Sequence, residues 1–161
     1  LSIAFRNSLD KSLSVGMAFG AQVFVCDNLA LTGSIVKIRK HTTNVWTDLE
    51  EMILTGVYRA RTSFIHAVDD AHRMQEIDIS TDGAYRALGH LFGHQVLSPR
   101  QMPVALKEWQ KPSHEAFEPR TLWSLYNAVT EALKSSPPQS IMEKHIGLHQ
   151  HLLPNQARWQ S

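Results

Sequence analysis

The chain has 161 residues, of which 43% are hydrophobic and 19% are charged, which is enough for one globular domain with a hydrophobic core. Its formal net charge of +1 excludes a polycation that binds nucleic acid through net charge alone. The sequence has no apolar run of the ~18 residues that a membrane helix needs and no basic-then-apolar leader, so we expect no membrane span. A single cysteine excludes an internal disulfide and suits a cytoplasmic protein, and Leu at position 1 suggests that an N-terminal portion is missing.

Three segments near the N-terminus have the composition of β-strands. Residues 2–5, 15–26 and 33–41 are rich in Val, Ile, Phe, Ala and Gly and lack helical spacing. Polar residues that favour turns by bonding to nearby backbone separate these segments, namely Asn7, Asp10, Asp27 and Asn28. The sequence therefore predicts a small antiparallel sheet at the N-terminal end.

Basic residues alternate with apolar residues in the third of these segments. Lys37, Arg39 and His41 are expected on one face of the strand, and Val36 and Ile38 on the other. Residues 1–45 hold five Lys and Arg against two Asp, a net charge of +3, whereas the remainder carries −2. The candidate nucleic-acid-binding residues are Arg6, Lys11, Lys37, Arg39, Lys40 and His41, with Phe5 or Phe24 as a base-stacking platform. The alternative is a solvated sheet face without a ligand.

The remainder of the chain, residues 46–161, has the pattern of several helices. The longest is predicted at 47–74, opening with a capping box formed by Thr47 and Glu50. Its core-facing residues are predicted from their spacing of three and four to be Leu49, Met52, Ile53, Val57, Ala60, Phe64, Ile65 and Val68. Further helices are predicted at 80–92, 102–109 and 121–134, before a last short helix and a frayed tail.

The fold class predicted from this order of elements is α+β. A small antiparallel sheet within residues 1–45 packs against the helices of residues 46–161, and residues 1–161 form a single domain.

Histidine pairs are the candidate metal ligands. His90 and His94 have zinc-ligand spacing on one helical face, but no third ligand is convincingly spaced, so they are weak candidates and no metal is expected. His145, His149 and His151 are interpreted as exposed or capping side chains. Asp69 and Asp70 beside His66 and His72 are interpreted as a charged helix face. No nucleotide-binding or paired-cysteine motif is present, so the sequence predicts no cofactor and does not favour an enzyme.

Four blocks carry a resemblance to a known family. They are FRNSLDKS at 5–12, VFVCDNLA at 23–30, RKHT at 39–42 and TLWSLYNAVTE at 121–131. With these blocks the chain resembles the phage and plasmid-like proteins of domain of unknown function family 932. The order of three strands and a long helix also resembles the β-β-β-α core of single-strand annealing recombinases of the Rad and phage Red types.

These resemblances imply a cytoplasmic protein of a phage-infected or plasmid-bearing bacterial host. From them and the basic strand we expect a homo-oligomeric protein that binds single-stranded DNA, with an annealing-type recombination factor as the specific hypothesis. One alternative is a phage-encoded protein-interaction module, such as an inhibitor of host defence, which would bind a protein partner. Another alternative is a metal-dependent hydrolase.

Overall fold

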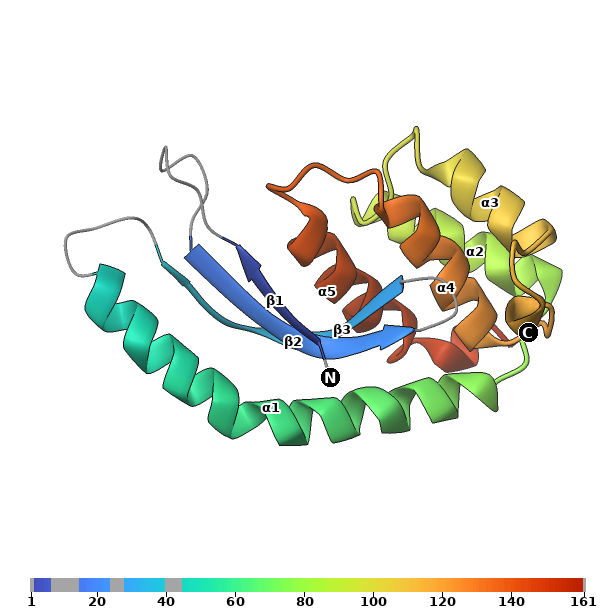
Figure 1. Ribbon diagram of the computed structural model, residues 1–161. Coiled ribbons are helices and arrows are strands. Elements are labelled where there is room, and N and C mark those ends of the chain that lie inside the picture. The colour runs from blue at the N-terminus through green and yellow to red at the C-terminus, as the bar shows by residue number, and fades with distance from the viewer. Residues whose placement is uncertain (1, 7–14, 24–27, 40–44, 161) are drawn as a thin grey trace.

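Three strands precede five α-helices in the computed structural model, which describes residues 2–6, 15–23, 28–39 and 45–160 (Figure 1). The strands are β1 (Ser2–Arg6), β2 (Val15–Val23) and β3 (Asn28–Arg39). The helices are α1 (Val45–Gln75), α2 (Thr81–Gly93), α3 (Met102–Gln110), α4 (Leu122–Leu133) and α5 (Ile141–Leu152). The described chain is mainly helical, and its strands lie at the N-terminal end, in the order that the α+β prediction requires.

The strands form one antiparallel sheet in the order β1-β2-β3, so β2 is central and β3 is an edge of the described sheet. The β2–β3 register is irregular between Met17 and Gly20, next to a glycine that tolerates such a bulge. Helix α1 packs on β2 and β3 and continues past the sheet to α4, while α5 contacts β3 (Figure 1). The sheet is thus held between the long helix and the C-terminal helices. The predicted turn residues Asn7, Asp10 and Asp27 lie outside the described residues.

Helix α1 buries small residues, and the predicted core-facing stripe is wrong in part. Gly56, Ala60 and Ala67 are buried toward the sheet side, whereas the predicted core residues Ile53, Val57 and Ile65 are exposed. Small side chains let a helix backbone approach a sheet closely, which spacing of large apolar residues does not predict. The helix also begins at Val45, before Thr47, so the predicted capping position lies inside it. None of the described helices is long and apolar enough to cross a lipid bilayer.

Helix α4 is the centre of the helical core. Thr121 caps its N-terminus, where the Ser124 amide donates to the Thr121 hydroxyl at 3.3 Å. Between Leu122 and Leu133, every residue except Trp123 and Glu131 is buried. A helix covered on nearly all sides must be surrounded by other elements, and α2, α3 and α5 supply Leu88, Trp109 and Leu148 to the same core. Helix α4 is therefore an internal helix and not one that covers the surface of the domain.

The predicted frayed tail is packed against the core. After α5 a short 3₁₀ turn, Gln156–Arg158, places Trp159 in a buried position, only 4% exposed. The Trp159 indole donates to the Leu152 carbonyl at 3.0 Å. Burial of an indole with its N–H satisfied stabilises this end of the chain, which residue composition alone does not reveal.

Gly83 in the first turn of α2 is expected to tolerate no side chain. A Cβ there would lie 1.8 Å from the carbonyl oxygen of Trp159 and 3.2 Å from the Ser80 hydroxyl. Because backbone must move to admit it, we expect Gly83→Ala to lower the free energy of unfolding by about 1–3 kcal/mol, measured by urea denaturation.

Gly89 in the same helix provides the matched control. A Cβ at Gly89 would meet no atom within 4 Å. Gly89→Ala should therefore raise the free energy of unfolding by up to about 1 kcal/mol through helix propensity. Equal effects of the two substitutions would contradict the close approach of Trp159.

Candidate functional site

Lys37 and Arg39 occupy alternate positions of β3. The register pairs Lys37 with Met17 and Arg39 with Val15, so the two cations share one face of the sheet with these β2 residues. Met17 and Val15 are only 6% and 3% exposed. This face is covered at the central strand, so a ligand would have to be contacted from the β3 edge.

The sheet divides the predicted basic surface. Arg6 pairs with Gly16, which pairs with Ile38, so Arg6 occupies the face opposite to Lys37 and Arg39. Lys11, Lys40 and His41 lie outside the described residues. Of the six predicted nucleic-acid-binding residues, the described structure therefore brings only Lys37 and Arg39 together.

The described structure adds a third histidine to the pair predicted from spacing. His90 lies in the last turn of α2, His94 is its C-cap residue, and His151 lies in the last turn of α5. One nitrogen from each ring lies within 4.8 Å of the others. The ring centroids of His94 are 4.1 Å from His90 and 4.3 Å from His151. Sequence spacing did not identify His151 as a third candidate, because it comes from a helix distant in sequence that meets α2 here.

The C-terminal histidines are not the exposed group that the sequence suggested. His145 is buried, and His149 and His151 are partly buried. The signal that sequence reasoning missed is their spacing on one helix, which places them at different rotations around its axis. His149 therefore contacts Asp70 of α1, whereas His151 lies beside His90 and His94.

His149 pairs with Asp70 of α1 across the helical layer. Its Nε2 lies 3.1 Å from Asp70 Oδ2, and Asp70 Oδ1 also accepts from Arg73 at 3.3 Å. Burial lowers the pKa of His149, although the Asp70 carboxylate acts in the opposite direction. Burial also raises the pKa of the Tyr126 phenol beside this pair. His66 and His72, the sequence neighbours considered for this acidic pair, are exposed. Asp70 instead contacts His149 and thereby connects α1 to α5.

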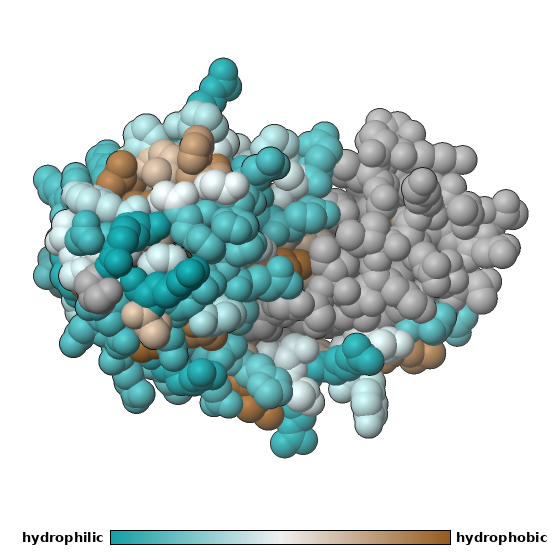
Figure 2. Space-filling model, turned by 180° about the vertical axis from the view of Figure 1, so that it is seen from behind, coloured by the Kyte–Doolittle hydropathy of each residue, from teal (hydrophilic) through white to brown (hydrophobic). Residues whose placement is uncertain are grey.

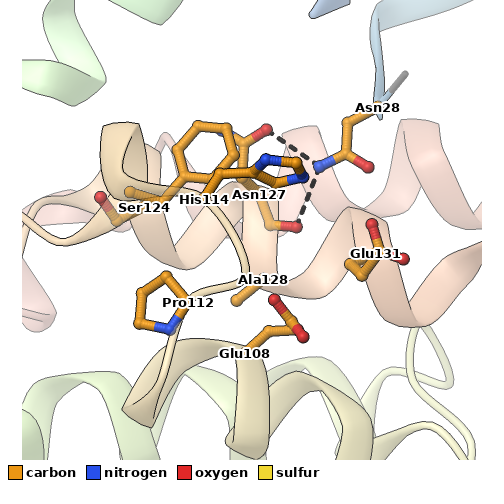
Figure 3. Close-up of a pocket in the computed structure, with 9 residues that line it drawn as sticks. Asn28, Glu108, Pro112, His114, Ser124, Asn127, Ala128 and Glu131 are labelled. Carbon is orange, nitrogen blue, oxygen red and sulfur yellow. Dashed lines mark hydrogen bonds between the residues drawn. The ribbon is translucent and has the colours of Figure 1, made fainter. Parts of the chain in front are cut away.

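A polar junction joins the start of β3 to α4 (Figure 3). The Asn28 amide donates to the Asn127 backbone carbonyl at 3.3 Å and to its side-chain oxygen at 3.1 Å, and both residues are buried. The Asn127 amide in turn donates to the Trp123 carbonyl at 2.9 Å. The described contacts of Asn28 thus reach α4, rather than only the nearby backbone that the turn interpretation assumed.

The pocket at this junction is too small for a substrate. Its lining includes Glu108, His114, Ser124 and Glu131, but its free volume of about 10 Å³ is the room that one water molecule needs. Buried Asn28 Oδ1 has no hydrogen-bond partner within the described part of the chain. The junction therefore serves to connect the sheet and the helices, and the residues around it do not form an open catalytic cleft.

A larger groove of about 370 Å³ lies between α2 and α3, within the usual range for ligand pockets. It is lined by Tyr85, Leu88, Gly89, Met102, Leu106 and Gln110. Its two polar side chains bond to each other, with the Gln110 amide donating to the Tyr85 hydroxyl at 3.1 Å. The groove has no charged lining residue, and its Tyr85 hydroxyl already accepts the hydrogen bond from Gln110.

If the hydrogen bonds between Asn28 and Asn127 connect β3 to α4, substitutions of the two residues should have non-additive effects on the free energy of unfolding. Asn28→Ala and Asn127→Ala should each lower the free energy of unfolding by about 1–3 kcal/mol, because each leaves buried polar atoms without partners. The double variant should lose less than the sum, since both changes remove the same hydrogen bonds. Urea denaturation of the four proteins measures this cycle, and additive losses would show that the bonds do not connect β3 to α4.

Two of the four blocks that carry the family resemblance, at 23–30 and 121–131, contain the residues of this junction. No curated protein and no solved structure matches the chain. A family model described as "Domain of unknown function (DUF932)" matches residues 1–153. The chain therefore belongs to the DUF932 family.

Proposed function

We propose that this protein binds single-stranded DNA as a homo-oligomer, in the manner of an annealing-type recombination factor. The observation that carries the proposal is the β1-β2-β3-α1 unit, with Lys37 and Arg39 at alternate positions of an edge strand. The order of these elements is the one in which the chain resembles Rad-type and Red-type annealing proteins.

The geometry of β3 supports contact with a phosphate backbone. Alternate residues of a strand are about 7 Å apart, so Lys37 and Arg39 can each reach a separate phosphate. Phe5 pairs with Met17, which pairs with Lys37, so Phe5 occupies the same face of the sheet. The central strand, with buried Met17, separates this position from Lys37, so the proposed contact rests on the two cations of β3.

An exposed hydrophobic row on α1 supports self-association. The row comprises Leu54, Val57, Tyr58 and Ile65, which are 65%, 66%, 88% and 48% exposed. Leu54, Tyr58 and Ile65 are spaced by four and seven residues, which places them on the side of α1 away from the buried Ala60 and Ala67, and Val57, three residues before Ala60, borders that side. Figure 2 shows hydrophobic side chains along the lower edge of the molecule, where α1 runs in Figure 1.

A second copy of the chain is the occupant that fits this row. Two-fold symmetry sets the same apolar row against itself, so one helix face supplies both sides of the contact. Burial of these side chains between subunits removes apolar surface from water. Each subunit of the oligomer also adds Lys37 and Arg39 to the DNA-binding surface, so one DNA strand can contact more cations.

The second candidate function, a protein-interaction module, rests on the same row. An unlike protein with an apolar groove would also bury these side chains. Such a module would be indifferent to nucleic acid, which the first of the following experiments decides.

Lys37→Ala and Arg39→Ala are expected to weaken binding of an oligothymidine single strand. Each lost phosphate contact should make the slope of log affinity against log salt concentration shallower by about 0.7. Fluorescence anisotropy at several salt concentrations measures both the affinity and the slope.

Two controls accompany this experiment. Arg6→Ala removes an equal charge from the opposite sheet face, and Lys107→Ala removes an exposed charge from α3. Both should keep the wild-type salt slope. Absence of binding by the wild-type chain, or equal losses in all four variants, would refute the proposed DNA surface.

Leu54→Glu and Tyr58→Glu are expected to dissociate the homo-oligomer. Both side chains are exposed within one subunit, so the substitutions should leave its fold intact but introduce charges into the contact. Light scattering after size exclusion measures the mass, with His66→Glu as a control on an exposed polar position of the same helix. A wild-type monomer, in the presence and absence of DNA, would contradict self-association through α1.

A further inference from the structure

The His90, His94 and His151 cluster has a ligand geometry that the proposed DNA surface does not use. It lies at the ends of α2 and α5, whereas Lys37 and Arg39 lie on β3. Nitrogen atoms of the three rings already lie within 4.8 Å of one another. Zinc–nitrogen bonds of about 2.0–2.1 Å place the ligand atoms of a tetrahedral site about 3.4 Å apart. Small rotations of the exposed His94 and the partly exposed His151 side chains can close this difference.

The hydrogen bonds around the cluster leave nitrogen lone pairs available. His94 Nδ1 lies 2.9 Å from the carbonyl oxygen of His90 and donates its proton there, which leaves the lone pair on His94 Nε2. This contact resembles the backbone hydrogen bonds that orient metal-binding imidazoles. His90 Nε2 is buried and has no hydrogen-bond partner among the described residues. A buried ring nitrogen without a partner is costly, and a metal ion would satisfy it.

The surroundings favour the neutral imidazoles that metal binding needs. Burial lowers the pKa of His90, and the nearby His94, His151 and Arg158 lower it further. Burial and His94 also lower the pKa of His151. Both shifts favour the neutral imidazole form, in which a ring nitrogen offers a lone pair to a metal ion.

We propose that His90, His94 and His151 bind one zinc ion, which clamps the end of α2 to the end of α5. Three imidazoles suit zinc better than magnesium or calcium, which prefer oxygen ligands. Three protein ligands leave the fourth position of a tetrahedral site to water. The clamp also holds the C-terminal segment, because the His90 ring lies 5.5 Å from the ring of buried Trp159.

The experiment uses the chain without an affinity tag, stripped of metal with a chelator and titrated with zinc alone. Calorimetry should give one zinc per chain, and zinc should raise the melting temperature. His94→Ala and His151→Ala should weaken zinc binding at least tenfold and abolish the rise in melting temperature. Cobalt serves as a second probe, because its visible absorption reports nitrogen ligands in tetrahedral geometry.

The control is His66→Ala, which removes an exposed histidine of α1 and should retain wild-type zinc binding. The metal-free melting temperature of each variant shows that it folds, so a loss of zinc binding is assigned to the missing ligand. Absence of stoichiometric zinc binding, or equal binding by all variants, would overturn the proposal. Because the titration contains no DNA, its outcome does not depend on the proposed DNA function.

Discussion

Burial of α4 is the constraint on which the rest of the structure depends. A helix covered on nearly every side stabilises the domain only if its polar groups find partners without water. Two of them are bonded within the helix, where the Thr130 hydroxyl donates to the Asn127 carbonyl at 2.9 Å and the Asn127 amide donates to the Trp123 carbonyl, whereas the buried Tyr126 hydroxyl has no hydrogen-bond partner among the described residues. Two contacts reach the helix from outside: the Leu122 amide donates to the Ile77 carbonyl at 2.8 Å, and the Asn28 side chain connects the sheet to Asn127.

Close packing of α1 follows from the small residues that face the sheet. Gly56, Ala60 and Ala67 let the helix lie near β2 and β3, and the larger Leu54 and Tyr58 are exposed. The same sequence feature that stabilises the subunit thus leaves an apolar surface outside it. In our proposal, the small side chains on one face of α1 stabilise the fold, and the large apolar side chains on its other face mediate self-association.

The two proposed sites depend on different parts of the fold. Lys37 and Arg39 are arranged by strand alternation, which is local, and the register adds that Arg6 lies on the other face. The histidine cluster is arranged by packing of α2 against α5, which is not local. The Asp70–His149 pair, in which His149 Nε2 lies 3.1 Å from Asp70 Oδ2, connects the same helix α5 to α1. Metal binding and DNA binding can therefore be separated by substitution.

The order of strands and helices, the starts of helices at Ser80 and Thr121, and the alternation of Lys37 and Arg39 were predictable from the sequence. These features depend on neighbours within a few residues, so periodicity and turn chemistry are sufficient to predict them. The resemblance of the chain to the DUF932 family was also recognisable from local blocks of sequence, and the family model confirms it.

Three features required packing between distant segments: the buried face of α1, the packing of the C-terminal tail, and the meeting of His151 with His90 and His94. Spacing within one helix cannot show which second helix will lie beside it. These contacts depend on the shape and volume of side chains from distant segments, because a close-packed core selects one arrangement among many that share the same apolar pattern.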